Sequence, residues 1–336
     1  MPRISGVMSA TLEALAERLL AGDRRALARA ITLIESRRSD HQLQAEELLD
    51  RLLPRTGQAV RLGISGPRRT GKSTFIEAFG QHVIEQGQKI AVLAVDPSSQ
   101  RSGGSILGDK TRMQRLAQRP EAFIRPSPTA GTLGGVTRRT REAMLACEAA
   151  GFDVVMIETV GVGQSETAVA DMVDGFVLLL APGGGDELQG IKRGIVELAD
   201  LVVINKADGD LLAAANLAKA DYQAALHLLR PPTPAWTPAV LTCSALEGAG
   251  IAEVWDTVLR HRQALEANDE LAAKRARQTR SWLWAEVQAG LTEALRSDAG
   301  TAELLGELET AIAADRLLPP QAARQLIDRF KRRSNH

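Results

Sequence analysis

The sequence is poor in cysteine, histidine and aromatic residues. It has two cysteines, Cys147 and Cys243, five scattered histidines among 336 residues, and an aromatic content of 3%. The cysteines lie far apart and outside any C-x-x-C spacing, which excludes a disulfide framework and favours buried thiols in a reducing compartment. The histidines fall into no spacing that a zinc site uses. Disulfide-stapled and zinc-cluster proteins are therefore not expected.

The sequence also lacks net charge and long apolar runs. Lysine plus arginine equals aspartate plus glutamate at 41 each, so no global attraction to nucleic acid or to a membrane surface follows. No apolar run approaches the roughly 20 residues of a membrane helix, and the N-terminal stretch MPRISGVMSATLEALAERLL lacks the apolar core of a secretory signal. We expect a cytoplasmic protein, with neither nucleic acid nor a membrane as its partner.

The hydrophobic pattern divides the chain into three zones. Residues 1–57 show helical periodicity that ends at Pro54 and Gly57. Residues 58–265 alternate short β-branched runs with amphipathic stretches, which predicts a doubly wound α/β domain with a mostly parallel sheet. Residues 266–336 read as helices with little core of their own, which favours a dimerisation arm over a cap on the same subunit. The predicted strands are AVRLGIS, KIAVLAVD, AFIRPS, DVVMIE, GFVLLLA, DLVVINK and AVLTCS.

The stretch GISGPRRTGKST, residues 63–74, matches the phosphate-binding pattern G-x-x-x-x-G-K-[ST]. It follows a predicted strand and opens a predicted helix, so backbone N–H groups and the helix N-terminus can surround phosphate oxygens. Lys72 is expected to bridge the β and γ phosphates as a catalytic residue, and the Ser73 hydroxyl to ligate magnesium. The candidate nucleotide-binding residues of this loop are Gly66, Pro67, Arg68, Arg69, Thr70, Gly71, Lys72, Ser73 and Thr74.

A carboxylate ends the buried run DVVMIE, residues 153–158. Glu158 at this strand tip can hold the magnesium shell, directly or through water, and is a catalytic candidate. An acidic strand end alone predicts a helix cap as readily as a functional group, but the phosphate-binding loop before it favours function. The N–H of Gly161, in the string ETVG, can sense the γ-phosphate.

The string NKAD, residues 205–208, follows another predicted strand and indicates guanine recognition. Asp208 can accept hydrogen bonds from the guanine N1–H and exocyclic amine, while Asn205 and Lys206 hold the loop and the ring. Adenine lacks this donor pair, so the predicted ligands are GTP and GDP with Mg²⁺ rather than ATP. A segment after AVLTC resembles the last guanine-contacting loop and supplies Ser244, Ala245 and Leu246.

Three polar, glycine-rich segments lie near the predicted strand ends. Residues 95–113, VDPSSQRSGGSILGDKTRM, suit a loop that becomes ordered around the γ-phosphate. Asp96 and Asp109 are candidates for the magnesium shell or for positioning water, and so for catalysis; Asp109 fits a helix N-cap equally well. Residues 161–172 would form a second switch, and residues 181–194 form another glycine-rich turn.

Taken together, these strings resemble the MeaB-like GTPases, the G-protein chaperones of adenosylcobalamin-dependent methylmalonyl-CoA mutase. The resemblance covers the N-terminal helices and all of residues 58–265, whereas the C-terminal helices match mainly in type. The strings that carry it, in the family's order, are VDPSS (95–99), GGSILGDKTRM (103–113), FIRPS (123–127), ETVGVGQSE (158–166), GGGDELQGIK (183–192) and NKAD (205–208).

The resemblance implies a homodimeric GTPase that binds the methylmalonyl-CoA mutase or a related acyl-CoA mutase. It would use GTP to gate the loading of intact cofactor and to protect or rescue the mutase. The resemblance places Asp96, Asp109 and Glu158 around magnesium, and makes residues 181–192 a third switch that couples the nucleotide to the mutase. The candidates for switching and coupling are Gln164, Asp186, Gln189 and Lys192, and Lys192 is also a catalytic candidate.

The sequence departs from this family at Pro67-Arg68-Arg69-Thr70, where the family usually has a small Pro-Gly-x-Gly-like run. Arg69 falls where such loops often use glycine with φ above zero, which would strain a residue with a side chain. Arg68 would sit near the γ-phosphate, where bulk can displace the attacking water and a guanidinium can stabilise transition-state charge. We predict retained guanine-nucleotide binding with altered, slower hydrolysis; the alternative is that both side chains point to solvent.

Three other functions fit parts of the pattern. A P-loop kinase or phosphotransferase would use the same loop, but NKAD argues against ATP. A metal-inserting GTPase shares the fold and the glutamate-bearing strand, but such proteins usually carry Cys or His ligands near the switches, and this sequence has none there. A nucleotide-gated binding module with very slow turnover stays open because of Arg68 and Arg69.

Overall fold

A computed structural model describes residues 10–67, 69–95, 113–126, 133–159, 165–183, 193–229, 231 and 233–334. The chain divides into two compact units, Met1–Arg275 and Ala276–His336. The strands, all in the first unit, are β1 (Val60–Ser65), β2 (Ile90–Val95), β3 (Ala122–Arg125), β4 (Val154–Thr159), β5 (Gly175–Leu180), β6 (Leu201–Ile204) and β7 (Ala239–Thr242).

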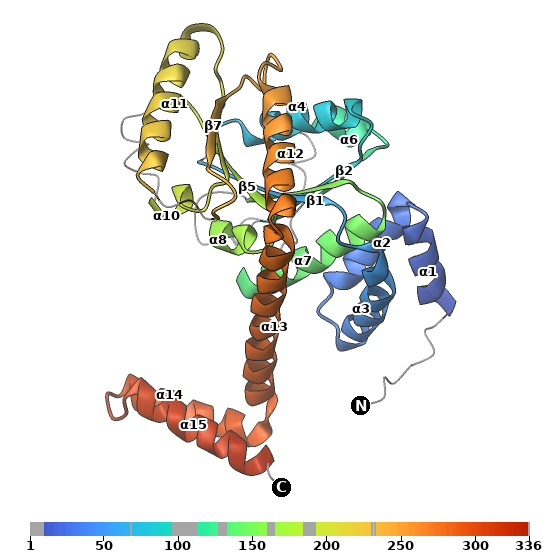
Figure 1. Ribbon diagram of the computed structural model, residues 1–336. Helices are drawn as coiled ribbons and strands as arrows, with labels where there is room; N and C mark the ends of the chain where they lie inside the picture. The colour runs from blue at the N-terminus through green and yellow to red at the C-terminus, as the bar shows by residue number, and fades with distance from the viewer. Residues whose placement is uncertain are drawn as a thin grey trace. The chain divides into compact units, whose positions relative to one another are not determined.

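Within the described residues, these seven strands form one sheet in the order β3-β2-β4-β1-β5-β6-β7 (Figure 1). Every neighbouring pair is parallel, with Ile64 opposite Glu158 between β1 and β4. All residues of β2, β4, β5 and β6 are buried, which explains their nearly continuous apolar sequences. The predicted doubly wound, parallel architecture is confirmed, and each predicted strand corresponds to an observed one.

Helices cover both faces of the sheet (Figure 1). One face packs Ile64, Met156 and Leu179 with residues of α4 and α12, whereas the other packs Ile157 and Leu178 with residues of α2, α3 and α7. Neighbouring strand residues thus point to opposite faces, as the pleat requires. The helices of this unit are α1 (Ala10–Leu20), α2 (Arg24–Ile34), α3 (Ser39–Leu52), α4 (Lys72–Glu85), α6 (Gln114–Gln118), α7 (Leu133–Ala149), α8 (Ser165–Ala170), α10 (Arg193–Val196), α11 (Leu212–His227) and α12 (Ile251–Ala267), with 3-10 turns η1 (Leu53–Arg55) and η2 (Gly209–Leu211).

The three N-terminal helices share a core with the sheet. Leu27, Ile31 and Leu48 are fully buried in the same apolar cluster as the strand residues of that face. The Asp23 carboxylate caps α2 by accepting from the N–H groups of Arg25 and Ala26. These helices therefore belong to the compact unit that contains the sheet.

Buried ion pairs join segments at the amino ends of the strands. Arg275 makes a bidentate pair with Asp174, and its guanidinium also donates to the carbonyl oxygens of Gly57 and Ala59. This anchoring attaches the first turns of α13 (Glu270–Ser297) to the first unit. The boundary between the two units accordingly falls after Arg275, about ten residues beyond the end of the predicted zone 58–265.

A second buried carboxylate, Asp200, lies beside these pairs. Its side chain accepts from the N–H of Phe176 at 2.9 Å and lies 3.5 Å from His261 Nε2 and 3.6 Å from Lys274 Nζ. Burial alone would raise the pKa of Asp200. The neighbouring His261, Lys274 and the backbone donor outweigh burial and hold the pKa of this carboxyl below its ordinary value.

The second unit contains most of α13, with α14 (Ala299–Ala313) and α15 (Pro319–Ser334). Asp298 caps α14 through the N–H of Thr301. Several large apolar side chains of α13 are exposed in the single chain: Leu283 at 59%, Trp284 at 60% and Leu291 at 59%. No helix among the described residues is long and apolar enough to cross a membrane.

Candidate functional site

The phosphate-binding pattern lies on the loop between β1 and α4, at the carboxyl edge of the sheet. Residue 66 must be glycine because a Cβ there would lie 2.1 Å from the carbonyl oxygen of Leu179 on β5. Gly71 caps α4 in the left-handed region, with φ of 85°, and a Cβ there would meet Asn205 Nδ2 at 2.8 Å. Gly66 is therefore required by the close approach of the β5 backbone, and Gly71 by its positive φ and the nearby Asn205 side chain.

Lys72 folds over this loop. Its Nζ donates to the carbonyl oxygens of Gly66 at 2.6 Å and Pro67 at 3.2 Å. The Thr70 hydroxyl donates to the same Pro67 oxygen at 3.0 Å and so closes the loop on itself. Ser73, half-buried, and Thr74, exposed, occupy the first turn of α4. A flexible ammonium at the mouth of the loop is the group that phosphate-binding loops use to contact anionic oxygens.

Arg69 adopts the conformation expected for glycine at its position. Its φ is 73°, in the left-handed region, and its side chain is exposed. The prediction of positive φ from sequence is thus confirmed. A side chain in this region costs roughly 1–2 kcal/mol of backbone strain.

Glu158 lies near the tip of β4, at 5% exposure. Strand alternation assigns it to the face of Val154 and Met156, which pack in the apolar cluster that includes the α4 residue Phe75. The carboxylate is therefore on the side of the sheet where α4 begins. Thr159, the next residue, belongs to the opposite face.

The NKAD string connects two other loops. Asn205, 2% exposed, donates from Nδ2 to the carbonyl oxygen of Thr70 at 2.9 Å. Its Oδ1 accepts from the N–H of Ala245 at 3.0 Å. One buried amide therefore fixes the phosphate-binding loop, the NKAD segment and the segment after β7 relative to one another, and the three predicted motifs come together.

Asp208 is oriented by the segment after β7. The Ser244 hydroxyl donates to Asp208 Oδ2 at 2.5 Å and also accepts from the N–H of Glu247 at 3.1 Å. Lys206 has φ of 60°, so its backbone bends sharply between Asn205 and Asp208. Of the predicted guanine-contacting residues after β7, Ser244 and Ala245 are buried and Leu246 is 81% exposed.

Cys243 lies beneath these loops, with Sγ 3.5 Å from Asn205 Oδ1. Burial, with a smaller effect from the Asp208 charge, raises the pKa of its thiol to about 12. Cys147 is buried as well, and burial raises the pKa of its thiol too. Both cysteines are free, buried thiols, as the sequence predicted.

Several predicted site residues lie outside the described part of the chain. These are Arg68, Asp96, Asp109, Gly161, Gln164, Asp186, Gln189 and Lys192. Within the described part, no group of three or more His, Cys, Asp or Glu side chains could hold a metal ion. Of the predicted magnesium ligands, two lie in the described part: Ser73 in the first turn of α4, and Glu158 near the tip of β4.

Sequence reasoning missed two residues at the root of the site. The Thr159 hydroxyl donates to Ser65 Oγ at 2.7 Å, and both side chains are fully buried. Hydroxyl residues at strand ends carry no periodic signal, so only the pairing of β1 with β4 reveals the contact.

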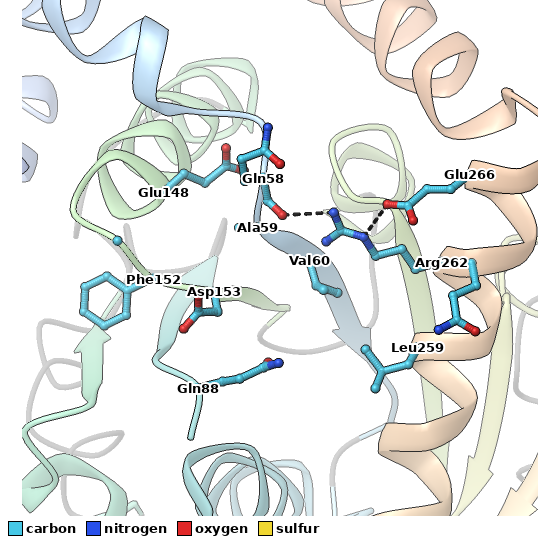
Figure 2. Close-up of a pocket in the computed structure, with 12 residues that line it drawn as sticks. Gln58, Ala59, Val60, Gln88, Glu148, Phe152, Asp153, Leu259, Arg262 and Glu266 are labelled. Carbon is cyan, nitrogen blue, oxygen red and sulfur yellow. Dashed lines mark hydrogen bonds and ion pairs between the residues drawn. The ribbon is translucent and has the colours of Figure 1, made fainter. Parts of the chain in front are cut away.

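A cavity of about 390 Å³ lies elsewhere in the first unit (Figure 2). Its walls include Gln58, Gln88 and Asp153, which precede β1, β2 and β4, together with Arg262 and Glu266 of α12. Arg262 bonds to Glu266 and to the Gln58 carbonyl oxygen, as Figure 2 shows. The cavity therefore lies at the amino edge of the sheet, opposite the candidate nucleotide site.

Known proteins match nearly the whole chain. A Caulobacter vibrioides protein named as a GTPase is 59% identical over 319 residues, covering 95% of this chain and 98% of the relative. The mouse "Methylmalonic aciduria type A homolog, mitochondrial" is 50% identical over 325 residues, which cover 94% of this chain and 78% of the mouse protein. The Escherichia coli "GTPase ArgK" is 49% identical over 322 residues, which cover 96% of this chain and 97% of the E. coli protein.

Structure and family comparisons agree with these relatives. A crystal structure of an LAO/AO transport system kinase superposes with a TM-score of 0.77 and 42% identity, covering 97% of this chain and all of that one. The family described as "Methylmalonyl Co-A mutase-associated GTPase MeaB" matches residues 27–300. With a parallel α/β sheet, a phosphate-binding loop and an NKAD segment joined by Asn205, the chain belongs to the MeaB family and is a guanine-nucleotide-binding GTPase.

Proposed function

We propose that this GTPase is a chaperone that assembles, protects or reactivates an adenosylcobalamin-dependent methylmalonyl-CoA mutase or a related acyl-CoA mutase. The observation that carries the proposal is the family match over residues 27–300, because that family is described by its association with methylmalonyl-CoA mutase. The similarity to the mouse methylmalonic aciduria homologue across 94% of this chain supports the same partner. GTP binding and hydrolysis would gate the interaction.

Co-purification tests the partnership. The full chain is mixed with candidate cobalamin mutases in GDP, in a non-hydrolysable GTP analogue and without nucleotide. We expect a complex whose amount depends on the nucleotide, and a loss of that dependence in Asp208→Ala, which removes the guanine-reading carboxylate. A chain that hydrolyses GTP but forms no nucleotide-dependent complex with any of these mutases would refute the chaperone role while leaving the GTPase intact.

The nucleotide would bind at the carboxyl edge of the sheet. Its phosphates would contact residues 66–74, with the Lys72 ammonium turning from the loop carbonyls to the β and γ oxygens. The Asp208 carboxylate, oriented by Ser244, would read the guanine edge. Asn205 supports this arrangement from beneath because it bonds to the loops on both sides.

Magnesium fits the donors near the loop. The Ser73 hydroxyl and the Glu158 carboxylate are hard oxygen ligands, and Mg²⁺ in nucleotide sites takes only one or two protein ligands besides phosphate and water. When bound, the ion would neutralise charge that develops on the phosphates. Glu158 would hold its shell, with Asp96 and Asp109 as further candidates.

Slow hydrolysis is the second part of the proposal. Arg69 in the left-handed region and its neighbour Arg68 stand where the family usually has small residues. Single-turnover GTP hydrolysis of the wild type is compared with Arg68→Gly and Arg69→Gly. Faster hydrolysis in either variant supports a braking role, slower hydrolysis supports a catalytic guanidinium, and unchanged rates in both would remove the idea.

A homodimer is proposed through the second unit. Leu283 and Leu291 lie eight residues apart on α13 with Trp284 beside Leu283, all about three-fifths exposed in the single chain. Such a stripe is stabilised when it is buried against a second helix. Light scattering should give a dimer for the wild type and a monomer for Leu283→Lys/Leu291→Lys, with Ala289→Lys, on the opposite and exposed face of α13, as a dimeric control. A dimeric double variant would refute this interface.

A phosphotransferase is the alternative that one observation favours, namely the kinase description of the superposable crystal structure. The Asp208 and Ser244 pair argues for guanine over adenine. Competition between ATP and GTP for the site decides between them, and a preference for ATP would reverse the assignment.

A further inference from the structure

We propose that Thr159 and Ser65 are a positioning pair that holds the tip of β4, and with it the Glu158 carboxylate, in register with the phosphate-binding loop. Their hydroxyl groups are joined by a 2.7 Å hydrogen bond, and each side chain is 0% exposed. Ser65 is the last residue of β1 and Thr159 the last of β4. The inference rests on the nucleotide and magnesium site proposed above, and does not depend on the mutase partner.

The bond lies where backbone pairing between the two strands stops. The register of β1 with β4 runs from Val60 opposite Val154 to Ile64 opposite Glu158. One step further, the hydroxyl groups of Ser65 and Thr159 form the cross-strand contact. The side-chain bond thus extends the attachment between the strands by one residue toward the candidate site.

At the tip of β4, the hydroxyl of Thr159 and the carboxylate of Glu158 lie on opposite faces of the sheet. Thr159 lies on the face of Val155 and Ile157, whereas Glu158 lies on the face that packs against α4. The hydroxyl pair can therefore fix the strand tip without occupying the space near Ser73. Because neighbouring residues share one peptide unit, a shift at Thr159 moves Glu158 as well.

The loop side of the pair is held as tightly. Gly66, which follows Ser65, lies so close to the Leu179 carbonyl of β5 that a Cβ would come within 2.1 Å. The Gly66 carbonyl oxygen accepts from Lys72 Nζ at 2.6 Å. The first residues of the loop are thus fixed by the close contact of Gly66 with β5 and by the hydrogen bond of Ser65 with Thr159. The pair sets the position of Glu158 relative to Lys72 and Ser73.

The decisive variant is Thr159→Val, which keeps the β-branched shape and removes the hydroxyl. The Ser65 Oγ then loses the hydroxyl that donates to it, and because Ser65 is fully buried, water cannot replace this donor. Thr159→Ser keeps the bond and is the conservative rescue. Thr257→Val is the matched control, because Thr257 is also fully buried and bonded, to the Glu253 carbonyl at 2.7 Å, but lies on α12.

Two measurements on the full chain test the pair: Mg²⁺ titration of the binding of a non-hydrolysable GTP analogue, and single-turnover GTP hydrolysis. Removing a group that orients a metal ligand typically weakens metal affinity by 10-fold or more, so we expect the Mg²⁺ concentration for half-maximal binding to rise about tenfold in Thr159→Val. Hydrolysis at fixed Mg²⁺ should fall about as much. Analogue binding in EDTA, which reports the loop without the metal, should stay unchanged. Thr159→Ser and Thr257→Val should match the wild type.

Three outcomes would overturn the inference. One is a Thr159→Val variant with wild-type Mg²⁺ dependence, and another is equal loss of analogue affinity with and without Mg²⁺, which would show general damage to the loop. If Thr159→Val does not fold, Ser65→Ala removes the other hydroxyl of the bond, and the same Mg²⁺ shift is expected. A wild-type dependence on Mg²⁺ in Ser65→Ala is the third outcome that would overturn the inference. A wild type that binds GTP without any Mg²⁺ dependence would instead refute the proposed metal site.

Discussion

Replacing Arg69 by glycine should stabilise the protein, which is unusual for a substitution in a functional loop. Arg69 has φ of 73° and an exposed side chain, so glycine removes strain and little packing. Relief of the left-handed conformation contributes roughly 1–2 kcal/mol. Glycine also gives the unfolded chain more freedom, which opposes this by about 0.4–1 kcal/mol. The net gain is about 0.8 kcal/mol, between limits of about 0 and 1.6 kcal/mol.

Thermal unfolding of the nucleotide-free protein measures this gain. For a folded unit of this size, 1 kcal/mol corresponds to a change in Tm of about 2–4 °C, so the central gain of about 0.8 kcal/mol should raise the Tm of Arg69→Gly by about 2–3 °C. Arg69→Ala is the control, because it removes the guanidinium and keeps a Cβ in the left-handed region. If the glycine and alanine variants unfold at the same temperature, backbone strain at this position is negligible and the reasoning is wrong.

Two further predictions concern buried polar groups. Asn205→Ala should weaken GDP binding by more than about tenfold in calorimetry, because the carbonyl of Thr70 and the N–H of Ala245 each lose a buried partner at about 1–3 kcal/mol apiece; wild-type affinity would contradict the bridging role. The pKa of Asp200 is lowered in the folded state, so its carboxylate contributes stability above the unfolded-state pKa of about 3.9, and that stability is lost as the pH falls toward the folded-state value. Asp200→Asn should therefore unfold at a lower temperature than the wild type at neutral pH, the gap should narrow as the pH falls below about 3.9, and a gap independent of pH would refute this.

Local residue patterns were sufficient to predict the architecture and the order of the motifs. Each strand is a short run of β-branched or other apolar residues, because parallel strands buried on both faces leave no room for polar alternation. The phosphate-binding loop and NKAD are contiguous strings, since each performs its task with neighbouring residues. The positive φ of Arg69 was predictable for the same reason: it follows from its place in one loop.

The contacts that hold the candidate site together depend on the tertiary structure. Asn205 reaches Thr70 across 135 positions of the chain, and Thr159 reaches Ser65 across 94. A lone amide or hydroxyl at a strand end has no periodicity, and its partner is determined by which strands are neighbours. The boundary after Arg275 has the same origin, because the Asp174 carboxylate and the carbonyls of Gly57 and Ala59 draw the start of α13 into the first unit. Sequence patterns report which residues are buried together on one element, whereas hydrogen bonds between distant polar groups exist only once the sheet has brought them within 3 Å.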